Sequence, residues 1–217
     1  MRVVVLSLAL GLVLGGAASA SHLDPQKQIR PADQKRAVAM LVRASDLPGY
    51  EVERTSDLEP HVDCRGLDES DLVLTGRAVA PYRSSDYRIV GATSAVYRTR
   101  ADSSAAWRRG TSPAARRCLR QAFIAQFARQ GETVRVTVEP LALPPLVAQR
   151  AGYRIVLTGA TAGQQPVATL DVVLLRVGRA QAALLFAAVV VPPDPTTRST
   201  IARTIAQRMR KVMRGAS

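Results

Sequence analysis

The chain has 217 residues, of which 47% are hydrophobic and 22% are charged. These values are ordinary for a globular protein, so they exclude intrinsic disorder and the fibrous and low-complexity classes. Lysine and arginine outnumber aspartate and glutamate 30 to 17. This excess of positive charge would attract polyanions. Only three of the thirty cationic residues are lysine, so an arginine-rich coding bias is an alternative explanation for the excess.

The first twenty residues have the pattern of an export signal. Arg2 is followed by an apolar run from Val3 to Leu14 and then by small residues up to Ala20, which matches the three regions of a signal peptide. We therefore expect residues 1–20 to be removed and the mature protein to act outside the cytoplasm. The apolar run is shorter than the ~20 residues that span a bilayer, so retention as an anchor is the less favoured alternative.

The remaining chain is expected to form a short polar leader, residues 21–30, and one domain, residues 31–217. A first helix begins at Pro31 and ends before Asp46, because proline suits a first helical turn. The segment 55–71 is acidic and irregular. Two strands, 72–79 and 87–98, should pair with each other.

Two helices follow these strands. The segment 101–109 predicts a short helix, and Ser112 caps a longer one that begins at Pro113 and ends at Arg129. Gly131 stops this helix.

The second half of the chain predicts strands and a final helix. Apolar residues alternate with polar ones or form apolar runs in 133–138, 153–157, 167–177 and 180–191. A two-residue loop, Gly178 and Arg179, joins the last two strands as a hairpin. Asp194 and Pro195 open a helix with one apolar face. This order predicts an α+β fold: an antiparallel sheet of five to six strands with amphipathic helices on one face.

The two cysteines, Cys64 and Cys118, are expected to form one disulfide after export. They lie 54 residues apart, so the bond would stabilise the fold by about 4 kcal/mol through loop closure. It would also bring the acidic segment 55–71 against a basic helix that carries Arg116, Arg117 and Arg120.

Four segments resemble a group of exported actinobacterial-type proteins that includes the sensor-like extracellular domains of serine/threonine kinases and related small cell-envelope proteins. They are Ala92–Thr99, Ala101–Trp107, Arg117–Leu119 and Asp171–Ala180. The resemblance implies an antiparallel sheet with helices beside it, acting as a ligand-sensing or binding module without catalytic residues. The chain departs from the group in lacking a kinase domain, a lipobox and a second cysteine pair.

Catalytic chemistry has little support in the sequence. His61 could serve a hydrolase, but no G-x-S-x-G elbow accompanies it. Glu69 and Asp71, or Asp57 and Glu59, could be offered as a glycosidase pair, and the acidic loop could be offered as a calcium site. The spacing of a calcium loop is missing, however, and aromatic residues make up only 4% of the chain. Phosphate-binding loops and zinc-ligand clusters are also missing from the sequence. We expect no cofactor and no metal.

The sequence thus favours a secreted, non-catalytic module that binds an unknown small ligand or an anionic envelope polymer. An exported hydrolase using His61 and an envelope-surface structural protein are the alternatives. Nucleic acid is not expected as a partner, a membrane surface is possible but not favoured, and a monomer is expected. The candidate contacts to an anion are Arg116, Arg117, Arg120, Arg203 and Arg210.

Overall fold

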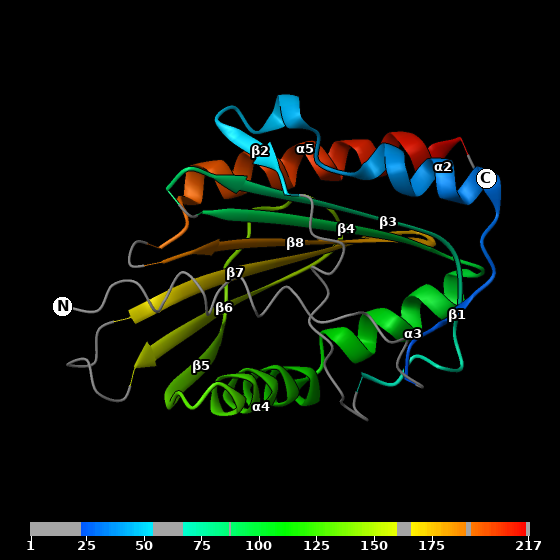
Figure 1. The fold of residues 1–217 in the computed structure, drawn as a ribbon. Helices are drawn as coiled ribbons and strands as arrows, with labels where there is room; N and C mark the ends of the chain where they lie inside the picture. Colours follow the sequence, from blue (N-terminus) through cyan, green and yellow to red (C-terminus); the bar gives the residue numbers. More distant parts are fainter. Residues whose placement is uncertain (1–22, 54–66, 87, 160–165, 190–191, 216–217) are drawn as a thin grey trace.

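The centre of the protein is a sheet of eight strands. The structure, a computed structural model, describes residues 23–53, 67–86, 88–159, 166–189 and 192–215. The strand order is β1-β3-β4-β8-β7-β6-β5, with β2 beside β3 (Figure 1). The strands are β1 (Gln26–Lys27), β2 (Tyr50–Val52), β3 (Val73–Ser84), β4 (Ile89–Tyr97), β5 (Val134–Pro140), β6 (Gln149–Gly159), β7 (Pro166–Val177) and β8 (Ala180–Ala188). All pairs are antiparallel except β1 with β3.

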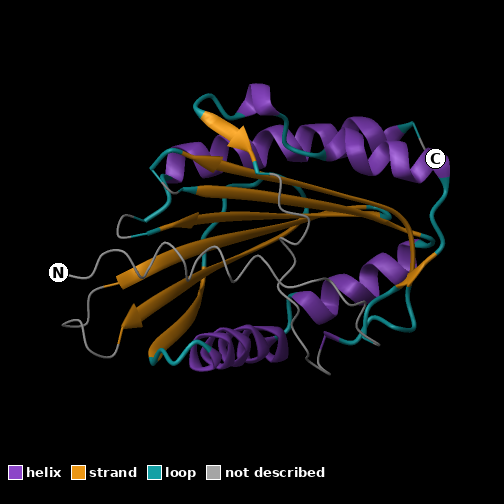
Figure 2. Cartoon of the chain, viewed as in Figure 1, coloured by secondary structure: helices purple, strands orange, loops and turns teal. Residues whose placement is uncertain are grey.

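Helices cover both faces of this sheet. On one face lie α2 (Pro31–Met40) and α5 (Pro195–Arg214), and on the other lie α3 (Arg100–Gly110) and α4 (Pro113–Arg129) (Figures 1 and 2). A short 3₁₀ helix, η1 (Ala44–Asp46), follows α2. The prediction of an α+β antiparallel sheet is therefore confirmed, but the prediction that the helices share one face is wrong.

The central strands are apolar on both sides, which is why both faces need a cover. On β7, Val173 and Leu175 belong to the core under α2 and α5, whereas Leu170 belongs to the core that includes Phe127 of α4. Successive strand residues point to opposite faces, so one strand supplies both cores. A nearly continuous apolar strand of this kind is typical of a sheet buried on two sides.

The sheet has more strands than the five to six expected. All six predicted strands are present, and the two additions are the short β1 and β2. β1 lies inside the segment expected to be a leader, where Gln26 and Lys27 pair with Val73 and Leu74. Two or three residues carry no readable alternation, so only the long-range pairing defines these strands.

Local sequence signals set the ends of α4 and of the last hairpin. The Ser112 hydroxyl accepts a hydrogen bond from the amide of Ala115 (3.1 Å), as expected for an N-cap. Gly131 follows α4 with a φ of 76°, and Gly178 in the β7–β8 turn has a φ of 60°, both in the region that favours glycine. These boundaries agree with the prediction.

A glycine lets α2 approach β3 closely. A Cβ atom at Gly76 would lie 2.3 Å from the carbonyl oxygen of Asp33, so the helix backbone rests on the strand. The buried Asp33 carboxylate accepts hydrogen bonds from Thr75 of β3 (2.7 Å) and from Arg179 of the β7–β8 turn (3.1 and 3.2 Å). These contacts fix the first turn of α2 on the sheet.

A buried ion cluster joins α5 to the sheet. The Asp171 carboxylate of β7 is fully buried and accepts two hydrogen bonds from Arg154 of β6, at 2.7 and 2.8 Å. Arg198, in the first turn of α5, also donates to Asp171 and is itself buried. One carboxylate thus holds two guanidinium groups beneath α5.

Several predictions concern residues outside the described part of the chain. These are the signal peptide at 1–20, the loop residue His61 and the disulfide partner Cys64. Within the described residues, no helix is both long and apolar enough to cross a membrane.

Candidate functional site

A cavity of about 270 Å³ opens on the sheet face that carries α3 and α4. Its floor is made by residues of β4 and β8, and its wall by the chain that enters β1 and β3. The lining residues are Leu23, Asp24, Pro25, Leu67, Glu69, Leu74, Arg77, Thr93, Ala95, Tyr97, Leu174, Gln181, Ala182 and Ala183. This volume is near the lower end of the range for small-molecule sites, roughly 300 Å³.

Short side chains create the space. Thr93 and Ala95 of β4 and Ala183 of β8 face this side of the sheet. The neighbouring residues, Val96 and Leu184, point to the opposite face and belong to the core under α2 and α5. The short side chains of these two strands therefore leave room on the face that carries α3.

Backbone hydrogen bonds hold the cavity wall in place. The amide of Glu69 donates to the carbonyl of Leu23 (2.8 Å), and the amides of Gln26 and Gln28 donate to Leu72 and Leu74 of the β3 region (2.9 and 2.8 Å). The wall is therefore an extension of the sheet through β1.

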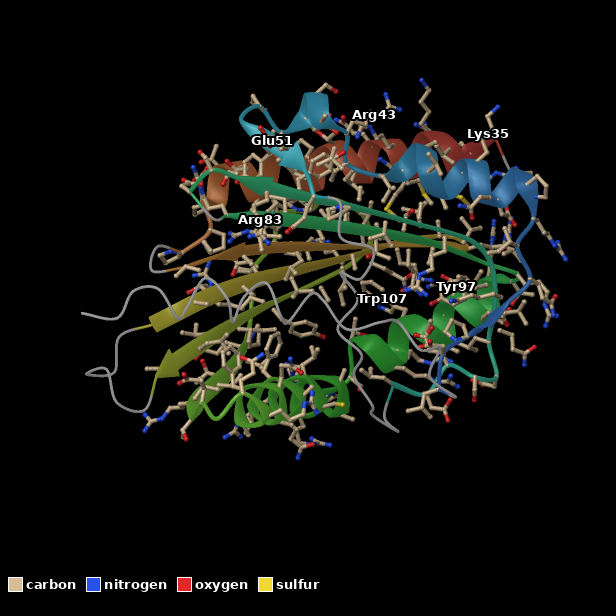
Figure 3. All side chains as sticks on the ribbon, viewed as in Figure 1. Lys35, Arg43, Glu51, Arg83, Tyr97 and Trp107 are labelled. Carbon is tan, nitrogen blue, oxygen red and sulfur yellow. The ribbon has the colours of Figure 1, made fainter. Side chains whose placement is uncertain are left out.

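Tyr97 and Glu69 form a hydrogen-bonded pair at the cavity. Tyr97, from the end of β4, lies between the sheet and α3 (Figure 3), and its hydroxyl donates to Glu69 Oε2 at 2.8 Å. Burial, followed by the charge of Glu69, raises the pKa of Tyr97 well above its ordinary value. Burial also raises the pKa of Glu69, against the opposing effects of Tyr97 and Arg109. The phenol therefore stays protonated and remains a donor at physiological pH.

Arg77 brings a cation to the same cavity. Its backbone is held by the Gln34 side chain of α2, which accepts from the Arg77 amide (3.0 Å) and donates to the Arg77 carbonyl (2.7 Å). Burial lowers the pKa of the guanidinium, and the nearby Asp24 carboxylate acts in the opposite direction. The lining thus holds charges of both signs.

The helix α3 is anchored beside the cavity through Ser103. The Gln181 side chain, which lines the cavity, donates to the Ser103 carbonyl (2.7 Å), and Arg176 of β7 donates to the Ser103 hydroxyl (2.9 Å). Because Ser103 is fully buried, these bonds fix the position of α3 on the sheet.

The cavity offers hydrogen-bond donors and acceptors to a small polar ligand. A guanidinium, two carboxylates, a phenol, a hydroxyl and an amide share the lining with apolar side chains, a combination found in small-molecule sites. In the described parts of the chain, no three metal-ligating side chains come together.

The structure places none of the predicted anion contacts at this cavity. Arg116, Arg117 and Arg120 lie on α4, and Arg203 and Arg210 lie on α5, so the two groups are on opposite faces of the sheet. Arg120 donates to the Val136 carbonyl (3.1 Å), and Arg210 donates to the Leu146 carbonyl. The five arginines therefore do not form one surface.

The acidic segment is also arranged differently from the expectation. In its described part, Asp71 pairs with Arg109 of α3 through two hydrogen bonds, and Asp68 accepts a further bond from Arg109 through its carbonyl. Glu69 lines the cavity, whereas Asp71 is exposed. The two carboxylates considered as a glycosidase pair therefore have different partners and surroundings.

Sequence reasoning missed most of the cavity residues. Arg77, Thr93 and Gln181 are ordinary strand residues in the sequence, and their common location depends on β4 pairing with β3 on one side and with β8 on the other. The available signal was the run of small side chains, Thr93 and Ala95, which marks a place where a strand leaves space.

No family model and no curated protein match the chain. Among solved structures, the chain is similar to the extracellular domain of PknH from Mycobacterium tuberculosis, with a TM-score of 0.54 and 10% sequence identity. The similarity covers 84% of this chain and 98% of that chain. At this level of identity it shows a shared fold, that of an extracellular domain.

Proposed function

We propose that the protein is an extracytoplasmic, non-catalytic, sensor-like domain that binds a small polar ligand in the cavity between β4, β8 and the β1 wall. The observation that carries the proposal is the cavity itself, where Arg77, Glu69 and Tyr97 meet over a floor of small side chains. The shared fold with an extracellular domain supports the location outside the cytoplasm.

An open cavity also favours ligand binding over a purely structural role at the envelope surface. A structural protein would gain stability by filling this space with larger side chains, because empty volume in a core costs free energy. Here the space is lined with polar groups, which water or a ligand can satisfy.

A thermal-shift screen tests the binding function. The purified mature protein is mixed with a panel of small amines, carboxylic acids, amino acids and sugars, and the midpoint of unfolding is measured. A ligand that binds only the folded state raises this midpoint in a concentration-dependent way. We expect at least one class of compound to do so.

Two variants locate the site. Arg77→Met and Tyr97→Phe remove polar groups of the cavity with little change in volume, and each should abolish the shift. Arg129→Gln is the matched control, because Arg129 is exposed on α4 and does not line the cavity. No shift with any compound, or a shift that survives both cavity variants, contradicts the proposal.

We propose that a disulfide between Cys64 and Cys118 stabilises the exported protein. Cys118 is buried in α4, and a bond to Cys64 would connect this helix to the segment that leads into the cavity wall. The support for this bond is the pair of cysteines in an exported chain.

A further inference from the structure

The outer surface of the α2 and α5 layer is basic. Both helices pack side by side on the sheet, α2 over β3 and β4 and α5 over β7 and β8. The side chains that point away from the sheet define the α2–α5 outer face. This face consists of Lys35 and Val38 of α2, Arg43 of the loop that follows α2, and Arg203, Gln207 and Lys211 of α5, all of them exposed. Lys35 and Arg43 extend away from the sheet in Figure 3.

The carboxylates of the same layer do not neutralise this face. Asp33 is buried against Thr75 and Arg179. Asp46 binds Arg208 of α5 through two hydrogen bonds at 2.6 and 2.9 Å, with only 14% of its side chain exposed. Asp194 is exposed, but it caps the N-terminal end of α5, far along the helix from Lys211. Within α2, η1 and α5 the acids are therefore internal or terminal and the cations face outward, whereas the exposed Glu51 lies on the neighbouring strand β2.

An apolar side chain lies among these cations. Val38 is 56% exposed in the last turn of α2, between Lys35 and Arg43 in sequence. A soluble polyanion gains little from contact with valine, whereas a lipid surface attracts cations to its headgroups and buries an apolar side chain at the same time.

The apolar stripe of α5 itself is already used. Ile201, Ile205 and Met209 are buried on the sheet. Contact with a membrane would therefore not require α5 to leave the fold, and it would use the outward side chains alone.

We propose that the α2–α5 outer face docks the folded protein on an anionic lipid surface, through Lys35, Arg43, Arg203 and Lys211 around Val38. In this orientation the sheet lies between the lipid and the cavity, because the cavity is on the face of the sheet that carries α3. The ligand site would thus stay open to the solvent.

Vesicle sedimentation tests the docking. The protein is mixed with vesicles of phosphatidylcholine alone or of phosphatidylcholine and phosphatidylglycerol in equal parts. We expect binding only to the anionic vesicles, and we expect it to weaken as sodium chloride is added, because salt screens exposed charges.

Charge-reversal variants identify the surface. Lys35→Glu with Lys211→Glu should lower the partition onto anionic vesicles by at least about tenfold, since each cation near an anionic leaflet contributes appreciably. Arg117→Glu with Arg129→Glu makes the same change in net charge on α4, on the opposite side of the sheet, and should have a much smaller effect. Thermal melting confirms that both variants fold.

Val38→Ser separates lipid from a soluble polymer. It should weaken vesicle binding severalfold while leaving binding to inorganic polyphosphate unchanged. Three results overturn the proposal: no binding to the anionic vesicles, equal losses in the two charge-reversal variants, or polyphosphate binding as tight as vesicle binding with no effect of Val38→Ser.

Discussion

Among the described residues, the buried carboxylates of Asp33 and Asp171 each have several hydrogen-bond partners. Asp171 is the clearest case, because a single fully buried carboxylate receives hydrogen bonds from Arg154 and from the buried Arg198. Removing one member of such a cluster leaves a buried charge without compensation, which is costly. Its contribution is therefore measurable by substitution.

Asp171→Asn should destabilise the protein by about 3–5 kcal/mol, because Arg198 then lies buried without its counter-charge. Urea denaturation measures the change in the free energy of unfolding. Asp86→Asn is the control, since Asp86 forms an exposed pair with Arg88 and its loss should have a far smaller effect. Equal effects of the two substitutions would show that the buried cluster adds no stability.

The environment of Asp33 predicts how the stability of the protein depends on pH. Burial would raise the pKa of its carboxyl, but hydrogen bonds from Arg179, Thr75 and Arg36 outweigh burial and lower the pKa from 3.8 to about 2. A carboxyl whose pKa is lowered in the folded state stabilises the protein at pH values above the ordinary pKa of that carboxyl. This stabilisation is lost as the pH falls through about 2.

The stability difference between the wild type and Asp33→Asn should therefore be constant at neutral pH and shrink as the pH falls from 3.8 toward 2. Denaturation curves at a series of pH values measure this difference. A stability difference that increases on acidification would contradict the lowered pKa of Asp33.

At the scale of elements, the closest helix–strand contact depends on a missing side chain. Gly76→Ala would place a Cβ atom 2.3 Å from the Asp33 carbonyl, against backbone that cannot bend aside as a side chain can. We expect a loss of about 1–3 kcal/mol and faster hydrogen exchange of the α2 amides, which mass spectrometry can follow.

Gly110→Ala is the matched control for this glycine. A Cβ atom at Gly110 meets nothing within 4 Å, and the residue ends α3 without a positive φ. This substitution should be neutral or slightly stabilising. Equal effects at positions 76 and 110 would contradict a close α2–β3 contact as the cause.

The elements with strong local signals were predictable from sequence, and those defined by distant contacts were not. Pro113 and Ser112 set the start of α4, and Gly178 set the last hairpin. β1 and β2 depend on pairing with β3 and have no local pattern of their own. The apolar run of β8 indicates burial on both sides, and this feature argues for helices on both faces of the sheet and not on one.

The cavity was less accessible to sequence reasoning than the fold. Tyr97 and Glu69 are 28 residues apart and meet because β3 pairs with β4, with Leu74 opposite Tyr97. A cavity is a property of how side-chain sizes combine across strands, and periodicity within one strand does not report it. The predicted arginines are separated because α4 and α5 cover opposite faces of the sheet, and a helix sequence does not show which face it will cover.

At the scale of the whole molecule, export and the disulfide remain predictions. The mature protein isolated from culture should begin at Ser21, and it should accept alkylating groups on Cys64 and Cys118 only after reduction. Intact-mass measurement with and without reductant tests both points. Replacing both cysteines with serine should cost about 4 kcal/mol of stability, and two thiols that react without reduction would refute the bond.

The strand order divides the sheet along one seam. The chain runs from β1 through β4, crosses by α3 and α4 to the far edge at β5, and returns strand by strand until β8 lies against β4. Residues Ile89 to Val96 pair there with Ala180 to Ala187, across some ninety positions of sequence. A polypeptide severed at the turn between α3 and α4 would give two meanders with matching open edges, so this turn is the natural place to divide the protein into complementing fragments.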